Sequence, residues 1–375
     1  MRSHVMINAT MLNEPSMTGL GVYTLNVLRE LLPLLIKDEQ VTEIVLLGDQ
    51  NRLSRLLGKL VESPGITVSY LAPTGPISRL LGLHRAVGRQ ARRGATVFYS
   101  PTHHGVLSGR VAQVVTIHDL FALLFPQNYR SQNRYFKWYV PRLLRKTQAV
   151  IADSDSTARD ISRFYGSKCT VETVHAALPT DLASATPAPV SSLEDTRFFL
   201  SIGPAYAYKN ADRLIDAFVQ FRMRYRAEDI RLVFVGGREP YLSYLKSYIE
   251  KNAVATRNEI VFLGYVSNQE LAWLYSRAVA AMVTSLYEGF GLPSLEAMHF
   301  GCPVVASNVG SLPEICGEAA LFVDPYEVDD IVRAMQQVTV DRKLRSNLKV
   351  KGESNLSRFG WHITARRVYA ILKNL

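Results

Sequence analysis

Short apolar runs alternate with helix-length amphipathic segments along nearly the whole chain, a pattern typical of parallel α/β sheets. The expected strands of the first half are residues 43–47, 67–71, 96–99, 114–117 and 149–152. Those of the second half are residues 198–202, 231–235, 260–263, 280–283, 303–306 and 320–323. The pattern therefore predicts an α/β protein with two doubly wound Rossmann-like domains.

Between these two sets of strands the chain is rich in Pro, Ser and Ala and has no hydrophobic periodicity. This composition predicts a linker at residues 181–196, between a first domain at 1–180 and a second at 197–356. An amphipathic helix is expected within 357–375. Two such domains are expected to face a cleft at the carboxyl ends of their strands, where α/β proteins bind ligands.

The bulk composition is that of a soluble protein: 375 residues, 47% hydrophobic and 20% charged, enough for two cores. Cys169, Cys302 and Cys316 have no CxxC spacing, so neither a disulfide framework nor a zinc site is expected. No signal peptide is recognisable, and the best apolar run, 112–125, is broken by a histidine and an aspartate. It falls short of the ~20 residues that cross a bilayer. These features predict a cytoplasmic protein without a membrane span.

The net charge of +10 lies almost entirely in the first half of the chain. Residues 1–180 hold 21 Lys and Arg against 12 Asp and Glu, while the remainder holds 22 against 21. Two basic segments, residues 77–93 and 129–146, interleave cations with apolar or aromatic side chains. They predict contact with an anionic membrane surface at the inner face of the cytoplasmic membrane. A solvated helix face or a grip on an acceptor's diphosphate remains an alternative, and no nucleic-acid-binding signature accompanies the segments.

The stretch from Glu288 to Glu296 carries the most specific chemistry. It places one carboxylate in a glycine-rich loop and a second eight positions later, with Pro293 in the first turn of a helix that ends at Gly301. Gly291 allows backbone to approach a ligand, and the helix start favours an anion. Carboxylates accept hydrogen bonds from hydroxyl groups. The spacing therefore outlines a site for a nucleotide-diphosphate sugar, although a capped helix with solvated glutamates has the same pattern.

This stretch, with the following GCPVVA and GSLPE motifs at 301–306 and 310–314, resembles the signature of family-four glycosyltransferases. The resemblance continues upstream in FLGYV at 262–266, LVFVGG at 232–237 and SIG at 201–203. It is weaker in the first half, at TGLGVY (18–23), IHDL (117–120) and ADS (152–154). It implies the GT-B fold, retention of anomeric configuration, and a last helix that crosses back onto the first domain.

The resemblance also implies roles for individual residues. The expected catalytic residues are His118, Lys209 and Glu288. The expected donor-binding residues are Gly21, Gly203, Lys209, Asn210, Arg238, Val266, Glu288, Phe290, Gly291, Leu292 and Glu296. The expected acceptor-binding residues are His103, His104 and Asp119. Gly21 lies in a loop expected to close over the diphosphate before a helix that begins near Val22.

No metal or other cofactor is expected. Stabilising the departing diphosphate requires either a divalent metal or fixed cations and backbone amides. The D-x-D of the first half, Asp153 to Asp155, is better interpreted as a helix N-cap, and Lys209 before a helix fits the fixed-cation alternative. Pro204 and Tyr208 stand where the family usually has a second cation, and Arg238 is expected to compensate.

The resulting hypothesis is a retaining hexosyltransferase. It would move mannose from GDP-mannose, or another hexose, to a lipid-linked or glycan acceptor in polysaccharide synthesis. Because a fold alone does not fix chemistry, two alternatives stay open. One is a nucleotide-sugar epimerase or phosphorylase of the same architecture. The other is a degenerate nucleotide-sugar-binding partner subunit.

Overall fold

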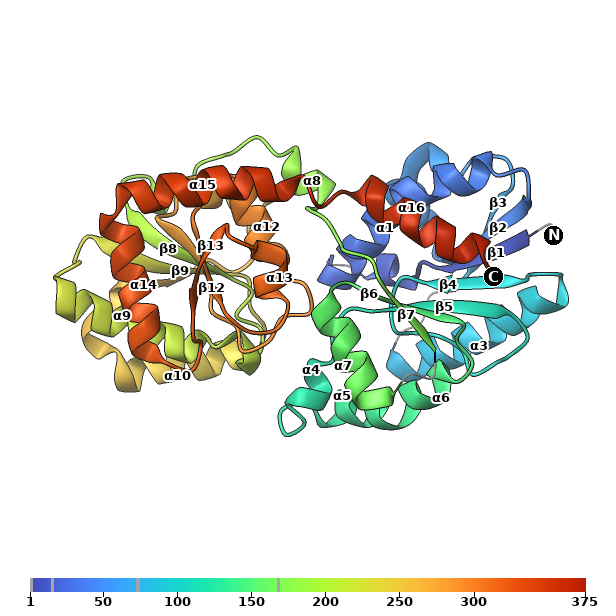
Figure 1. Ribbon diagram of the computed structural model, residues 1–375, viewed down its shortest axis with the longest axis horizontal. Helices are drawn as coiled ribbons and strands as arrows, with labels where there is room; N and C mark the ends of the chain where they lie inside the picture. Colours follow the sequence, from blue (N-terminus) through green and yellow to red (C-terminus); the bar gives the residue numbers. More distant parts are fainter. Residues whose placement is uncertain (1–2, 15–16, 72–74, 167–168) are drawn as a thin grey trace. The chain divides into compact units, whose positions relative to one another are not determined.

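The computed structural model describes residues 3–14, 17–71, 75–166 and 169–375. The chain forms two compact units (Figure 1). The first comprises Met1–Ala177 and Phe359–Leu375, and the second Leu178–Arg358. Residues 181–196, expected as a linker, lie within the second unit. They form part of α8 (Thr180–Ala183) and a 3-10 turn, η4 (Ser191–Leu193), and the N–H of Ala188 donates to the carbonyl of Gln269 at 3.0 Å.

The first unit is built on a seven-stranded parallel sheet with the order β3-β2-β1-β4-β5-β6-β7. Its strands are β1 (Ser3–Asn8), β2 (Val41–Gly48), β3 (Ile66–Tyr70), β4 (Val97–Ser100), β5 (Ala112–Ile117), β6 (Ala149–Ala152) and β7 (Thr170–Thr173). Its helices are α1 (Gly19–Lys37), α2 (Gln50–Leu57), α3 (Pro76–Arg92), α4 (Phe121–Leu124), α5 (Arg130–Arg134), the π-helical turn η3 (Tyr135–Tyr139), α6 (Val140–Leu144), α7 (Asp155–Tyr165) and α16 (Trp361–Lys373).

Two strands of this sheet were not predicted. β1 is buried, but its run is short and flanked by polar residues, with His4 and Asn8 themselves buried. β7 lies at the sheet edge and is only half-buried, so it carries little hydrophobic signal. The other five first-half strands lie where the alternation placed them.

The glycines at 19–21 were expected in a loop, and this prediction is wrong. α1 begins at Gly19, with Thr18 as N-cap accepting a hydrogen bond from the N–H of Gly21 at 3.4 Å. Gly21 is therefore in the first turn of the helix.

α1 is also long and apolar enough to cross a membrane by length and composition, although 56% of its most apolar window is buried inside the unit. The sequence of α1 is not an uninterrupted apolar run, because Asn26, Arg29 and Glu30 lie within it.

The last helix, α16, packs on α1 within the first unit. Trp361 meets Tyr23 edge-on, with ring centroids 5.5 Å apart. The hydroxyl of Thr364 donates to the carbonyl of His175 at 2.7 Å, and that of Tyr369 donates to Asp38 at 2.7 Å. The carboxyl-terminal residues therefore complete the core of the unit that the amino-terminal residues begin.

The second unit is a six-stranded parallel sheet with the order β10-β9-β8-β11-β12-β13. Its strands are β8 (Arg197–Ile202), β9 (Ile230–Val235), β10 (Ile260–Phe262), β11 (Ala280–Val283), β12 (Val304–Ser307) and β13 (Ala320–Val323). Its longer helices are α9 (Ala211–Tyr225), α10 (Tyr241–Asn252), α11 (Asn268–Arg277), α12 (Leu292–His299), α14 (Val328–Val340) and α15 (Arg342–Leu356), with the shorter α13 (Leu312–Cys316). The prediction of two doubly wound α/β sheets is confirmed.

Each sheet has one point at which the strand order reverses. It lies between β1 and β4 in the first unit and between β8 and β11 in the second. In open α/β sheets, ligands bind outside the carboxyl ends of the strands at such a switch point. Phe199, Phe218, Phe221 and Phe234 fill the core of the second unit and hold the loops that follow β8 and β11 on a rigid base.

Candidate functional site

A small pocket lies at the switch point of the second sheet, between the loops that follow β8 and β11. Both strands, both loops and the first turn of α12 line it through Ser201, Ile202, Lys209, Met282, Val283, Thr284, Ser285, Glu288 and Pro293. The positive end of the α12 helix dipole therefore lies at the pocket, an arrangement that favours a bound anion.

Lys209 and Glu288 form the central ion pair of this pocket. Lys209 Nζ donates to Glu288 Oε1 at 2.7 Å and to Oε2 at 3.0 Å. The hydroxyl of Ser285 donates to Oε1 at 2.6 Å. The two charged side chains are 19% and 9% exposed. The structure therefore brings together two residues that are 79 positions apart and that the sequence had assigned separately, and it shows the Glu288 carboxylate paired rather than solvated.

Glycines of the signature allow the Glu288 loop to pack tightly. A Cβ at Gly310 would lie 3.2 Å from the backbone N and O of Glu288, and the hydroxyl of Ser311 donates to the Glu288 carbonyl at 2.9 Å. Gly291, the N-cap of α12, has φ +98°, and a Cβ there would lie 2.7 Å from Leu312 Cδ2. These positions require glycine because a side chain would clash or be strained.

Glu296 lies on α12, 9% exposed, and accepts a hydrogen bond from the Tyr275 hydroxyl at 2.7 Å. Burial raises the pKa of the Glu296 carboxyl, and the Tyr275 hydrogen bond and the Lys209 charge offset part of that rise. The carboxylate was expected to meet ligand hydroxyls, and in the structure it already has a protein hydroxyl as donor. Tyr275 had no recognisable signal in the sequence.

Asn210 was expected to contact the donor, but its side chain is committed to the protein. Its amide nitrogen donates to the carbonyls of Thr284 at 3.0 Å and Pro325 at 2.8 Å, and its oxygen accepts from Arg213 at 2.9 Å. The residue is fully buried and has φ +60°. Asn210 thus ties the β8 loop to the loops after β11 and β13, a structural role that the motif alone does not reveal.

Pro204 and Tyr208 supply no cation, and both are buried. The ring of Tyr208 stacks on Tyr206 with centroids 5.7 Å apart, and Lys209 Nζ lies 5.4 Å from the Tyr208 ring. The exposed Arg238 follows β9 and reaches the Tyr206 hydroxyl at 3.5 Å. A hydrogen bond with Tyr265, then the charge of Tyr206, raises the pKa of its guanidinium.

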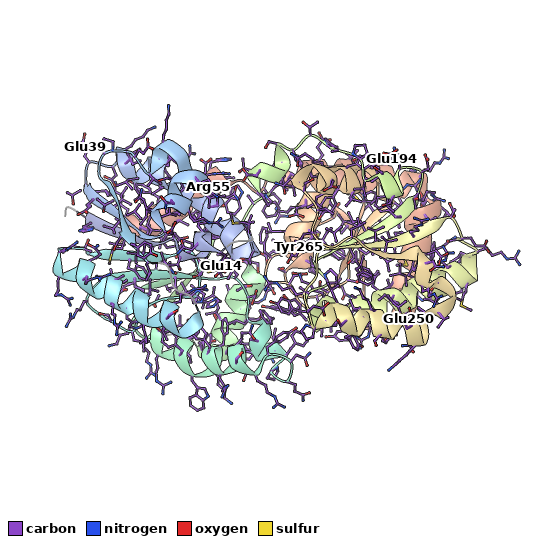
Figure 2. The ribbon with its side chains drawn as sticks, turned by 180° about the vertical axis from the view of Figure 1, so that it is seen from behind. Glu14, Glu39, Arg55, Glu194, Glu250 and Tyr265 are labelled. Carbon is purple, nitrogen blue, oxygen red and sulfur yellow. The ribbon has the colours of Figure 1, made fainter. Side chains whose placement is uncertain are left out.

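Of the remaining expected donor residues, all but Gly21 lie in the second unit. Gly203 has φ +70° directly after β8, and Val266 is half-buried after β10, next to Tyr265, which is 75% exposed (Figure 2). Phe290 is buried and Leu292 begins α12. Gly21 belongs to the first unit and lies inside α1.

In the first unit, His118 follows β5 and both of its ring nitrogens are bound. Nδ1 lies 2.5 Å from Asp153 Oδ2, and Nε2 lies 2.9 Å from the Pro101 carbonyl oxygen. A carbonyl only accepts, so Nε2 carries a proton. Burial by itself lowers the pKa of His118, but the charge and hydrogen bond of Asp153 outweigh it, with smaller contributions from Pro101 and Asp119, and the pKa is raised. Nδ1 faces a carboxylate and Nε2 faces a carbonyl, so neither ring nitrogen of His118 presents a free lone pair.

The D-x-D sequence divides into separate roles. Asp153 pairs with His118, Ser154 caps α7 by accepting from the N–H of Thr157 at 3.0 Å, and Asp155 is exposed in the first turn. Among the described residues, no group of three or more His, Cys, Asp or Glu side chains is arranged to hold a metal ion. The N-cap interpretation of this sequence is thus the one that the geometry shows, whereas the His118–Asp153 pair was not foreseen.

His103 and His104 lie after β4 with ring centroids 4.3 Å apart, near the rings of Tyr135 and Phe136. Burial, followed by neighbouring positive groups, lowers the pKa of His103 well below its usual value and that of His104 to about 3. Both rings are therefore neutral near pH 7. Neutral imidazoles and tyrosines offer hydrogen bonds and ring faces of the kind that bind sugars. Asp119, the third expected acceptor residue, is half-buried and adds its charge to that around His118.

Comparison with known families covers both units. The description "Glycosyltransferase Family 4" matches residues 18–182, and "Glycosyl transferases group 1" matches residues 186–355. Among curated proteins, the chain is 32% identical over 260 residues to O-antigen chain mannosyltransferase B of Escherichia coli, covering 66% of each protein. It is 28% identical over 266 residues to the serotype-specific mannosyltransferase WbdA of the same species. That match covers 67% of this chain but only 32% of WbdA.

Solved structures resemble the whole chain. Sucrose-phosphate synthase from Thermosynechococcus elongatus superimposes with a TM-score of 0.76 at 18% identity, covering 100% of this chain and 99% of that one. HepE of Anabaena, solved in complex with UDP and glucose, superimposes with a TM-score of 0.74 at 17% identity over 100% of both chains. Likenesses at this identity establish the fold only.

Proposed function

Since the chain belongs to the glycosyltransferases that combine a family 4 domain with a group 1 domain, we propose that it transfers mannose from a nucleotide-diphosphate mannose, with GDP-mannose as the first candidate, to a glycan acceptor. The sugar is suggested by the two curated relatives, both named as mannosyltransferases and one of them as a mannosyltransferase of the O-antigen chain. A nucleotide-diphosphate donor is suggested by the neighbour solved with UDP and glucose.

The observation that carries the proposal is the Lys209–Glu288 pair at the α12 end of the pocket. An unliganded phosphate site must neutralise its own cation, and Glu288 does this for Lys209. When a diphosphate binds, Lys209 exchanges the carboxylate for phosphate oxygens, and Glu288 is released to accept hydrogen bonds from sugar hydroxyls. Fixed positive charge aimed at the departing diphosphate is the kind of preorganised stabilisation that lowers the barrier.

We further propose transfer with retention and without a catalytic metal. Among the described residues discussed above, His118 has both ring nitrogens bound and is not arranged as a free general base, and Glu288, once released by Lys209, is proposed to accept hydrogen bonds from the donor sugar. The acceptor hydroxyl then passes its proton to a leaving diphosphate oxygen while its own oxygen bonds to the anomeric carbon. The bond to the diphosphate breaks on the same face, so the configuration is kept.

The first unit is proposed to bind the acceptor and an anionic membrane surface on the cytoplasmic side. Arg85, Arg89 and Arg92 of α3 and its C-cap Arg93 are exposed, and Leu81 of the same helix is 53% exposed. The side chain of Ile77 lies outside the described residues. In the second basic segment Trp138 is 59% exposed among further exposed cations, namely Arg130, Arg134, Lys137, Arg142, Arg145 and Lys146. Such a mixture of cations and apolar side chains suits an anionic interface.

A thermal-stabilisation screen with GDP-mannose, UDP-glucose and the bare nucleoside diphosphates tests the proposal. A ligand that binds only the native state raises the unfolding temperature. At a ligand concentration of 100 Kd, it increases the free energy of unfolding by about 2.7 kcal/mol. We expect the wild type and the control Lys246→Ala, altered on an exposed α10 position, to be stabilised, and Lys209→Ala not to be. Equal stabilisation of all three proteins would remove Lys209 from the site. Stabilisation without any sugar transfer would instead favour a degenerate binding subunit, consistent with Pro204 and Tyr208.

A further inference from the structure

A second polar site lies at the switch point of the first sheet, where β1 ends at Asn8 and β4 ends at Ser100. Asn8 Nδ2 donates to Ser100 Oγ at 3.0 Å, and Asn8 Oδ1 accepts from the hydroxyl of Thr10 at 2.8 Å. Ser100 Oγ lies 3.3 Å from Thr102 Oγ1, which lies 3.0 Å from His104 Nδ1. Asn8, Thr10, Ser100 and Thr102 are all at most 1% exposed. A fully satisfied buried network of this kind is rigid.

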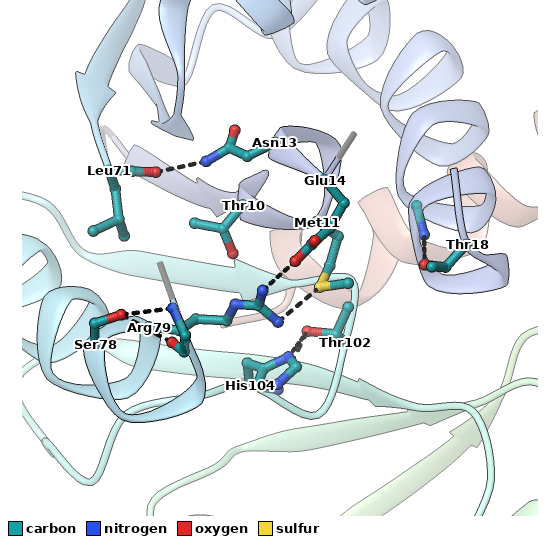
Figure 3. Close-up of polar contacts among 12 residues, drawn as sticks. Thr10, Met11, Asn13, Glu14, Thr18, Leu71, Ser78, Arg79, Thr102 and His104 are labelled. Atoms are coloured by element: carbon teal, nitrogen blue, oxygen red, sulfur yellow. Dashed lines mark hydrogen bonds and ion pairs between the residues drawn. The ribbon is translucent and has the colours of Figure 1, made fainter. Parts of the chain in front are cut away.

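Arg79, from α3, points at this network and is poorly supplied with acceptors (Figure 3). Within the part of the chain that the structure describes, one terminal nitrogen is paired with Glu14, and the other contacts the thioether of Met11 at 3.6 Å, a weak acceptor. Among the described residues, its buried Nε has no hydrogen-bond partner. A guanidinium has five N–H donors in a planar fork that matches an oxyanion, so these donors are largely unused.

We propose that Arg79 is a phosphate-binding residue of the acceptor site. Without acceptor, the Glu14 carboxylate pairs with the Arg79 guanidinium, and a phosphate group of the acceptor replaces this carboxylate on binding. Arg79 is 16% exposed and Glu14 37% exposed, so the pair can be reached from solvent. The inference rests on the proposed function for the identity of the ligand as an acceptor, whereas the oxyanion site itself rests on the geometry of the first unit.

The neighbouring side chains favour an anion that carries a sugar. Arg79 is close enough to lower the pKa values of His103 and His104, after the effect of burial, so both imidazoles stay neutral and do not compete for the anion. Thr102 and His104 are drawn near the guanidinium in the view of Figure 3, and the hydrogen bond between Thr102 Oγ1 and His104 Nδ1 at 3.0 Å holds the imidazole in place. The site thus combines one oxyanion fork with neutral hydrogen-bonding groups, the chemistry of a phosphorylated saccharide or a lipid-linked sugar diphosphate.

The test follows the Nε–H signal of Arg79 in full-length protein labelled with 15N-arginine, assigned by its loss in Arg79→Lys. The protein is titrated with inorganic phosphate against sodium chloride of equal ionic strength. We expect a saturable shift with phosphate alone. Glu14→Gln keeps an acceptor for Arg79 but removes the competing charge, so phosphate should bind about two- to fivefold more tightly, the factor that corresponds to a partly exposed ion pair. Arg163→Gln, which removes an exposed cation on α7, is the matched control and should leave the affinity unchanged.

An Arg79 signal that ignores phosphate, or a Glu14→Gln protein that binds phosphate no better than the wild type, would overturn the inference. Repeating the titration with farnesyl diphosphate and with mannose 1-phosphate separates the sources of the phosphate. Tighter binding of the first assigns the site to a lipid carrier, and tighter binding of the second to a phosphorylated sugar. Binding of GDP-mannose is measured on the same samples. If GDP-mannose does not bind but the Arg79 signal shifts with phosphate, the proposed function alone is refuted. If GDP-mannose binds but the Arg79 signal does not shift, this inference alone is refuted.

Discussion

Replacing Asp153 by Asn tests whether His118 is charged. The two side chains are 5% and 12% exposed, so their ion pair is shielded from solvent. Removing one partner of a buried pair costs about 3–5 kcal/mol. Asn keeps a hydrogen-bonding group beside Nδ1, so we expect the lower end, about 3 kcal/mol. In a unit of this size each kcal/mol corresponds to about 2–4 °C, so Tm should fall by about 6–12 °C at pH 6.

The dependence on pH gives the sharper result. Asp153 raises the pKa of His118 above its unfolded value of about 6.5. A group whose folded pKa is raised contributes stability that is fully present below the unfolded pKa and is lost as pH rises through the folded pKa. Once pH has risen through the folded pKa, His118 is neutral in both proteins, and an Asn amide can donate to Nδ1. The destabilisation by Asp153→Asn should therefore shrink to less than about 1 kcal/mol.

Scanning calorimetry from pH 6 to pH 10 measures this dependence, because it can separate the transition that the substitution shifts from one that it leaves unchanged. Asp155→Asn, two positions along and exposed on α7, is the control and should show a small effect without this pH trend. A destabilisation by Asp153→Asn that is constant with pH, or that grows at high pH, would show that His118 is neutral. A neutral His118 could offer a lone pair to an acceptor hydroxyl.

Four further predictions concern the donor site and the membrane. Glu288→Gln should leave nucleoside diphosphate affinity unchanged or raised, because Lys209 loses its competitor, while transfer falls about 100-fold or more. Glu296→Ala should weaken nucleotide binding and cost about 1–3 kcal/mol of stability, because the Tyr275 hydroxyl loses its acceptor; equal effects of both changes on nucleotide affinity would contradict this division. Transfer should survive EDTA, and a rate abolished by the chelator and restored by magnesium or manganese would refute the fixed-cation account. Binding to anionic vesicles should fall steeply with salt and on neutralising Arg85, Arg89, Arg92 and Arg93, each contributing about 1 kcal/mol; full-length protein that does not bind such vesicles at low salt would exclude this surface.

Much of the fold could be predicted because a buried parallel strand is a continuous apolar run that stands out locally. β1 was not predicted because polar residues flank its short apolar run. β7 was not predicted because it lies at the sheet edge, where partial exposure leaves little hydrophobic pattern. The helix signature at Glu288 was equally local: its glycines, Pro293 and the helix start all lie within one short stretch. For these strands and for α12, a signal carried by consecutive residues was enough to predict the element.

The partners of the site residues could not be predicted in the same way. His118 and Asp153 are 35 residues apart, and Arg79 and Glu14 are 65 apart, so only the folded sheet brings them together. A motif indicates that a side chain belongs to a loop at a strand end, but not whether it faces a ligand or the protein. Asn210 illustrates the difference, because its amide nitrogen donates to loops that follow other strands and its amide oxygen accepts from Arg213 of α9. The prediction of a loop at the start of α1 was wrong for a related reason, because a Gly-x-Gly pair fits both a loop and a first helical turn.

The most direct test of the central claim is the rate of mannose transfer from GDP-mannose to a mannose-containing glycan, measured for the wild type, Lys209→Ala and the control Lys246→Ala. If Lys209 stabilises the departing diphosphate, its removal should lower the rate by about 100- to 1,000-fold, the loss typical of one preorganised charge or donor in a transition state. The control should match the wild type, and the new linkage should keep the anomeric configuration of the donor. A Lys209→Ala enzyme as fast as the wild type, or a product of inverted configuration, would contradict the account.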